Sequence, residues 1–179
     1  MTILLAFSRA VDWVNGQFGR IATWCVLLAC LISAGNALSR YTISVSSNAW
    51  LEIQWYLFGA MYLLGAPLTL KLNEHVRVDV IFGNHKPRTQ AWIDLVCGAL
   101  FLMPAVVMIG WMSWPMFAES FAIGEMSNNA GGLPRWPVKL LVPVGFALLA
   151  LQGLSEIIKR LAVLSGHLER AATYAKPQQ

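Results

Sequence analysis

The sequence predicts an all-α integral membrane protein with four transmembrane helices and an additional N-terminal amphipathic helix at the membrane interface. Four long runs contain no Asp, Glu, Lys, Arg or His: residues 21–39, 53–70, 95–118 and 140–155. A helix rises about 1.5 Å per residue, so such a run crosses most of a hydrocarbon core about 30 Å thick. The composition agrees, because 57% of the residues are hydrophobic and only 12% are charged, which is unlike a soluble domain.

The spans and their connections use almost the whole chain of 179 residues, so we expect a single membrane domain, residues 1–179. The expected spans are about 20–40, 50–71, 92–115 and 137–159, with a cytoplasmic tail over 160–179.

Residues 1–19 carry a different pattern. Apolar side chains recur at helical spacing, with polar residues between them: Leu4, Phe7, Val11, Val14 and Phe18. This pattern predicts an amphipathic helix in the interface, followed by a turn into the membrane at Arg20. A frayed first turn of the first span is the alternative.

The basic residues predict the orientation. Ten Lys and Arg residues lie before the first span, between the second and third, and after the fourth. The other side has only three, Arg40, Arg135 and Lys139. The positive-inside rule therefore predicts that both termini and the middle connection are cytoplasmic. Since this charge lies between the spans and forms no continuous basic face, the formal net charge of +4 does not indicate nucleic-acid binding.

No ionisable residue lies near the middle of any span, which indicates that the chain does not move an ion or a charged solute by itself. Cys25, Cys30 and Cys97 lie inside spans without a CxxC pair, as expected of small buried side chains. The three histidines lie outside the spans, without the spacing of metal or haem ligands. We therefore expect neither an enzyme nor a cofactor or metal site in this chain.

Two stretches are distinctive. One is WLEIQWYLFGAMYLLGAPLTLKLNEHVRVDVIFG, from Trp50 to Gly83, and the other is GGLPRWPVKLLVPVGFALLALQG, from Gly131 to Gly153. Both resemble the small membrane subunit (DctQ-like) of tripartite ATP-independent periplasmic (TRAP) transporters. The string His75-Val76-Arg77-Val78-Asp79 is the more specific part, because it combines charge with a fixed place after the second span. With the four-span layout, the resemblance covers roughly residues 15–165.

The chain departs from that family at one place. Many members carry paired acids and a nearby arginine at the start of the second span. Here Glu52 is followed by Ile53, and aromatic residues take the basic position. At this position the sequence resembles the branch of the family associated with 2-oxo acids and related monocarboxylates.

The resemblance implies a scaffold role in a bacterial inner-membrane complex. A large membrane subunit (DctM-like) would carry the substrate and sodium sites, and a periplasmic binding protein would deliver an organic acid. Transport would be sodium-driven symport without ATP, with membrane lipids around the complex. The family-motif or interface candidates in this chain are Glu52, Gln54, His75, Arg77, Asp79, Glu119, Gly131, Gly132, Pro134, Lys139 and Gln152.

Several of these residues have more than one interpretation. Glu52 is either a coupling-ion ligand or a hydrogen-bonded acid at the interface. Arg77 and Asp79 either pair with charges on the partner subunit or clamp the middle connection. Glu119, Glu125 and the glycine turn either contact the binding protein or belong to a solvated loop.

Two other functions are consistent with a small four-span chain. One is a homodimeric four-helix exporter, but such chains are shorter and depend on an acid embedded in the first span, which 21–39 lacks. The other is a structural subunit of an unrelated membrane complex, against which only the two family-like stretches argue.

The charge bias predicts the outcome of reporter fusions. Fusions after Gln179 and within Asn84 to Gln90 should be active in the cytoplasm, and fusions near Asn128 in the periplasm. A periplasmic C-terminus would contradict the predicted orientation.

Overall fold

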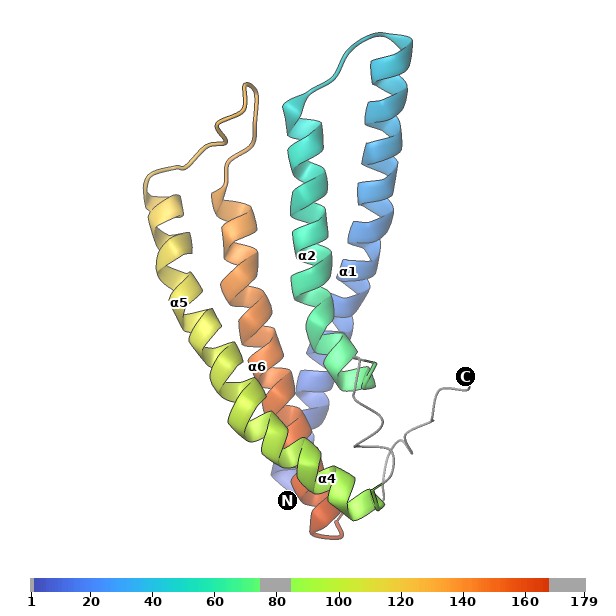
Figure 1. Cartoon of the computed structure of the whole chain (residues 1–179), viewed down its shortest axis with the longest axis vertical. Helices are drawn as coiled ribbons and strands as arrows, with labels where there is room; N and C mark the ends of the chain where they lie inside the picture. The colour runs from blue at the N-terminus through green and yellow to red at the C-terminus, as the bar shows by residue number, and fades with distance from the viewer. Residues whose placement is uncertain (1, 75–84, 168–179) are drawn as a thin grey trace.

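Long helices make up most of the described chain (Figure 1). The computed structural model describes residues 2–74 and 85–167. The elements are α1 (Thr2–Thr42), α2 (Asn48–Leu72), α4 (Pro87–Cys97), the π-helical segment η1 (Gly98–Leu102), α5 (Met103–Ala122) and α6 (Trp136–Leu164). The α4, η1 and α5 segments follow one another without a break. The described residues form no β-strand, only an isolated bridge between Met126 and Pro134.

The prediction of four membrane-spanning helices is confirmed. Four helices are long and apolar enough to cross a membrane: Thr2–Thr42, Asn48–Leu72, Pro87–Ala122 and Trp136–Leu164. The third begins earlier than expected, at Pro87, because a proline fits the first turn of a helix, where its missing N–H leaves no bond unmade.

The N-terminal segment differs from the prediction. We expected a turn at Arg20, but α1 runs unbroken through it for 41 residues, about 60 Å. Nor is its start frayed, since the helix begins at Thr2. The buried residues of this segment include Ser8 and Asn15, and both hydrogen-bond to α6. The first turns therefore stay part of the bundle, because their polar face has partners inside it.

Helix α6 is the centre of the arrangement. It contacts α1, α2, α4, η1 and α5. Figure 1 shows α1 and α2 to one side of it and α5 to the other, with α4 crossing its lower end. We call the end with connections 43–47 and 123–135 the upper end. The lower end carries Thr2, Pro87 and Leu164.

Helices α1, α2 and α6 approach one another through small side chains, as is usual between helices in membranes. Their buried apolar cluster consists of Ala22, Cys25, Ala60, Leu64 and Leu148.

Gly145 allows a close approach of α6 to α2. A Cβ there would lie 2.8 Å from the Leu63 Cβ and 3.0 Å from the Leu63 carbonyl oxygen. That carbonyl has no helical donor, since Pro67, four residues later, has no N–H. At this point the backbone of α6 therefore packs directly against the backbone of α2.

The π-helical segment sits directly before Pro104. The Met103 N–H reaches back to the Gly98 carbonyl, one residue further than in an α-helix. A wider turn makes room for a proline, whose ring clashes with the carbonyl four residues earlier. The third span therefore continues through its proline.

Candidate functional site

The connection between α5 and α6 is a closed hairpin, which we call the strap (residues 124–135). Its backbone bonds join Ser127 N–H to the Leu133 carbonyl at 3.0 Å and Arg135 N–H to the Glu125 carbonyl at 2.8 Å. Gly132 N–H donates to the Asn129 carbonyl at 3.0 Å and closes the tip. The strap thus has a defined shape of its own.

Glu52 fastens the strap to α2. Its Oε1 accepts hydrogen bonds from the Ser127 hydroxyl and, at 2.8 Å, from Asn129 Nδ2. Its Oε2 accepts the Leu133 N–H at 2.7 Å. Both carboxylate oxygens therefore accept hydrogen bonds from the strap, as expected if Glu52 is a hydrogen-bonded acid at the interface.

The two glycines of the strap have different reasons to be glycine. Gly131 has a φ of 69°, in the left-handed region that disfavours a side chain. At Gly132 the limit is space, because a Cβ would lie 2.5 Å from the Ser127 Cβ and 2.9 Å from Glu52 Oε1. The next candidate, Pro134, accepts a hydrogen bond on its carbonyl from the Tyr56 hydroxyl at 2.8 Å.

Two basic residues add further contacts to the strap at the upper end. Arg135 Nη2 donates to the Ser127 hydroxyl at 3.5 Å, and the same hydroxyl donates to Glu52. Lys139 forms a salt bridge with Glu125. Hydrogen bonding from the Lys139 ammonium lowers the pKa of Glu125. Because the pKa of Glu125 is lower in the folded state, the pair contributes its full stabilisation at pH values above the unfolded-state pKa. This stabilisation is lost as the pH falls through the folded-state pKa of Glu125.

The remaining predicted candidates at the upper end lie apart from the strap. Glu119 is exposed on α5. Gln54 is half-buried on α2, and its Nε2 has no hydrogen-bond partner among the described residues. His75, Arg77 and Asp79 lie outside the described residues.

Gln152 is the centre of a second polar cluster, near the lower end. Its side chain is completely buried. Its Nε2 donates to Asp12 Oδ1 at 2.9 Å and to Glu156 Oε1 at 3.0 Å, and its Oε1 accepts from Asn15 Nδ2 at 2.8 Å. The amide nitrogen and the amide oxygen of Gln152 therefore both have partners, and these bonds join α6 to α1.

Charged groups surround Gln152. Lys159 pairs with Asp12 at 2.8 Å and with Glu156 at 2.7 Å. Lys71, at the end of α2, donates to the Asp12 carbonyl at 3.0 Å. The cluster therefore joins three helices.

A serine pair extends the cluster along the same two helices, with the hydroxyls of Ser8 and Ser155 2.6 Å apart. Our sequence analysis missed the α1 partners Ser8, Asp12 and Asn15. Their helical spacing, facing that of Gln152 and Ser155, is a signal that could have indicated them.

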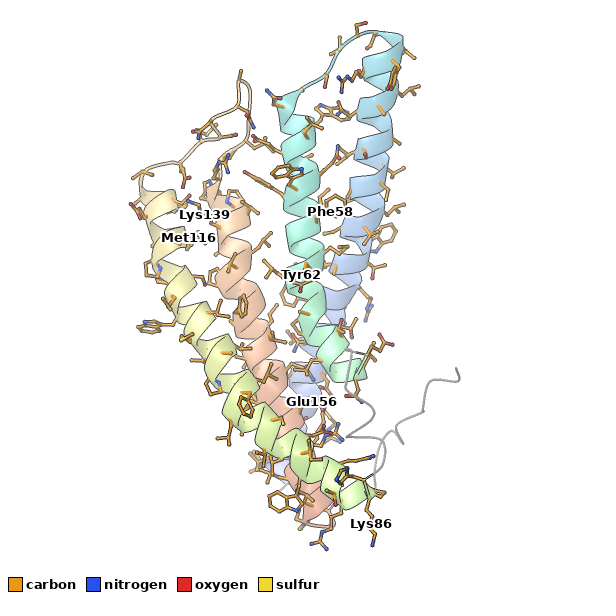
Figure 2. All side chains as sticks on the ribbon, in the orientation of Figure 1. Phe58, Tyr62, Lys86, Met116, Lys139 and Glu156 are labelled. Atoms are coloured by element: carbon orange, nitrogen blue, oxygen red, sulfur yellow. The ribbon has the colours of Figure 1, made fainter. Side chains whose placement is uncertain are left out.

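A groove opens between α2, the α4–η1 segment and α6. Its volume is about 1020 Å³, and its walls include Met61, Tyr62, Phe101, Leu149 and Ile157. Near its lower end Arg160 Nε lies 3.2 Å from Asp94 Oδ2 and joins α6 to α4. Figure 2 labels Phe58 and Tyr62 along α2, above Glu156.

The hydrogen bonds and ion pairs of these side chains join helices and the strap to one another. Within residues 2–74 and 85–167, no three His, Cys, Asp or Glu side chains lie where they could hold a metal ion. The charge-free runs 21–39, 53–70, 95–118 and 140–155 separate the charged groups towards the upper end from those towards the lower end.

The fold and the two clusters define a polytopic membrane protein with polar clusters that join its helices towards both ends. A family model described as "Tripartite ATP-independent periplasmic transporters, DctQ component" matches residues 29–163. The chain belongs to this family, the small membrane component of TRAP transporters. No curated protein and no solved structure matches it.

The lower cluster predicts a selective effect of Gln152→Leu. The change leaves Asn15, Asp12 and Glu156 each without one bond, so we expect a loss of roughly 1–3 kcal/mol in unfolding free energy. Gln54→Leu is the matched control, because the Gln54 Nε2 has no partner to lose. Thermal unfolding of both variants in detergent micelles is the measurement. Equal shifts in Tm would contradict the role assigned to Gln152.

The strap yields a second prediction. Glu52→Ala removes the acceptor of three hydrogen bonds, so the strap should open and trypsin should cut after Arg135 severalfold faster. Mass spectrometry of fragments from protein in lipid nanodiscs measures the rate. The control is Glu119→Ala, which removes an exposed acid outside the strap. Trypsin should cut this variant at the wild-type rate. Unchanged cleavage in Glu52→Ala would show that the strap holds its shape without α2.

Proposed function

We propose that this chain is the non-transporting scaffold subunit of a sodium-coupled TRAP transporter in a bacterial inner membrane. In this proposal it stays fixed against a large membrane subunit, which carries an organic acid and sodium across the membrane. A periplasmic binding protein delivers the acid to the upper end of the complex.

One observation carries the proposal: a chain of the DctQ family has no ionisable group in the middle of its spans. The runs 21–39, 53–70, 95–118 and 140–155 are free of charged residues. A pathway for an ion or a carboxylate needs polar groups near the bilayer centre. The substrate and sodium therefore belong to a partner.

The use of the polar groups also supports a scaffold. Gln152 and Lys159 both donate to Asp12 near the lower end, and Glu52 bonds to the strap at the upper end. Breaking such buried bonds costs free energy without a compensating partner. A chain held at both ends suits a stationary role better than a moving one.

The homodimeric exporter is less well supported. Such an exporter needs an acid that is free to bind protons or cationic substrates within the membrane. The acid of α1, Asp12, is instead paired with Lys159 and accepts a bond from Gln152.

Reconstitution tests the proposal. Liposomes with this chain alone should take up no organic acid under an inward sodium gradient. Liposomes with the chain, its large subunit and the binding protein should take it up, and collapse of the gradient should stop uptake. Accumulation by the chain alone, above empty liposomes, would contradict the scaffold function, and efflux of cationic dyes by it would favour the exporter.

A further inference from the structure

We propose that the groove between α2, α4–η1 and α6 receives one transmembrane helix of the large subunit, and that this helix bonds the hydroxyl of Tyr62. This inference rests on the proposed function for the existence of the partner. It adds the surface, the type of partner element and the contact residue.

The groove lies at the depth of the spans. Its walls come from three helices, with Met61 and Tyr62 on α2, Phe101 on η1, and Leu149 and Ile157 on α6. Among residues 2–74 and 85–167 the groove is open at the surface of the helices, with a volume of about 1020 Å³. The apolar walls require an apolar occupant.

Tyr62 distinguishes a protein occupant from a lipid chain. It follows Asn48, the first residue of α2, by 14 positions and precedes Leu72, the last, by 10. At about 1.5 Å per residue, it lies about 21 Å from one end and 15 Å from the other. Tyrosines of membrane proteins concentrate at the interfaces, where the hydroxyl meets water. A mid-depth hydroxyl has no water, and an unbonded polar group in hydrocarbon is costly.

The other polar groups along the groove already have bonds within the chain. Asp94 pairs with Arg160, and Glu156 accepts from Gln152 and Lys159. The Thr69 hydroxyl donates to the Gly65 carbonyl at 3.3 Å. Tyr62, by contrast, is 75% exposed.

An acyl chain has neither donor nor acceptor, so it would fill the groove and leave the Tyr62 hydroxyl unbonded. A helix from another chain supplies side-chain donors and acceptors, and interhelical hydrogen bonds are a regular means of association in membranes. A helix of the large subunit therefore satisfies both the shape and the chemistry.

Photocrosslinking in the assembled complex tests the contact. The photoreactive amino acid p-benzoylphenylalanine replaces Tyr62 in one variant and Trp111 in another. Trp111 is 80% exposed on α5 and does not line the groove. Position 62 should crosslink to the large subunit and position 111 should do so far less. Crosslinks from position 62 only to lipid, or only to a second copy of this chain, would overturn the proposal.

Two substitutions test the energetics by co-purification with a tagged large subunit. Tyr62→Phe removes only the hydroxyl and should weaken recovery about threefold, the effect of an average interhelical hydrogen bond in a membrane. Leu149→Trp fills the groove and should reduce recovery at least tenfold. Leu151→Trp, the same change on the same helix outside the groove, should recover wild-type amounts.

The outcomes separate the two proposals. If wild-type chain binds the large subunit and Leu149→Trp binds equally well, the groove is not the docking surface, while the proposed scaffold function stands. If the wild-type chain does not bind a large subunit at all, the proposed function fails, and the groove proposal fails with it.

Discussion

The buried amide of Gln152 is the interaction on which the bundle depends most. In lipid, helices gain little from the hydrophobic effect on associating, so close packing and hydrogen bonds must hold them together. Gln152 lies on α6, the helix that contacts every other one, and it bonds Asn15 and Asp12 of α1. Lys71 brings the end of α2 to the same place. One buried cluster thus fixes the positions of three helices.

Fixing the chain at its two ends explains the shape between them. The strap binds α2 to the α5–α6 pair through Glu52, while the Gln152 cluster and the Asp94–Arg160 pair bind α1 and α4 to α6. Near mid-depth, α2 and the η1 segment stand apart and leave the groove. A groove between fixed helices is a preformed surface, so a partner would not have to order it on binding, which favours association.

The spans could be predicted because each is a local property of the sequence: a charge-free run of sufficient length. The contacts could not, since they join residues far apart in the chain. Asp12 and Gln152 are separated by 140 positions, and no local pattern selects one pairing of polar stripes over another. The turn expected at Arg20 was wrong for the same reason. Local amphipathicity suggested a surface helix, whereas the partners of Ser8 and Asn15 lie on α6.

The strap also gives a physical account of the family departure at the second span. The sequence neighbours of Glu52 include Trp50, Trp55 and Tyr56, and the basic residue of α2 is the distant Lys71, so Glu52 has no basic neighbour on its own helix. In the fold, Arg135 donates to the Ser127 hydroxyl, which in turn donates to Glu52, so a basic residue of the strap shares a hydrogen-bond partner with the carboxylate. The Leu133 N–H and the Asn129 amide supply further donors. An acid at the membrane interface needs stabilising donors, and a hairpin that folds back onto α2 provides them without an adjacent arginine.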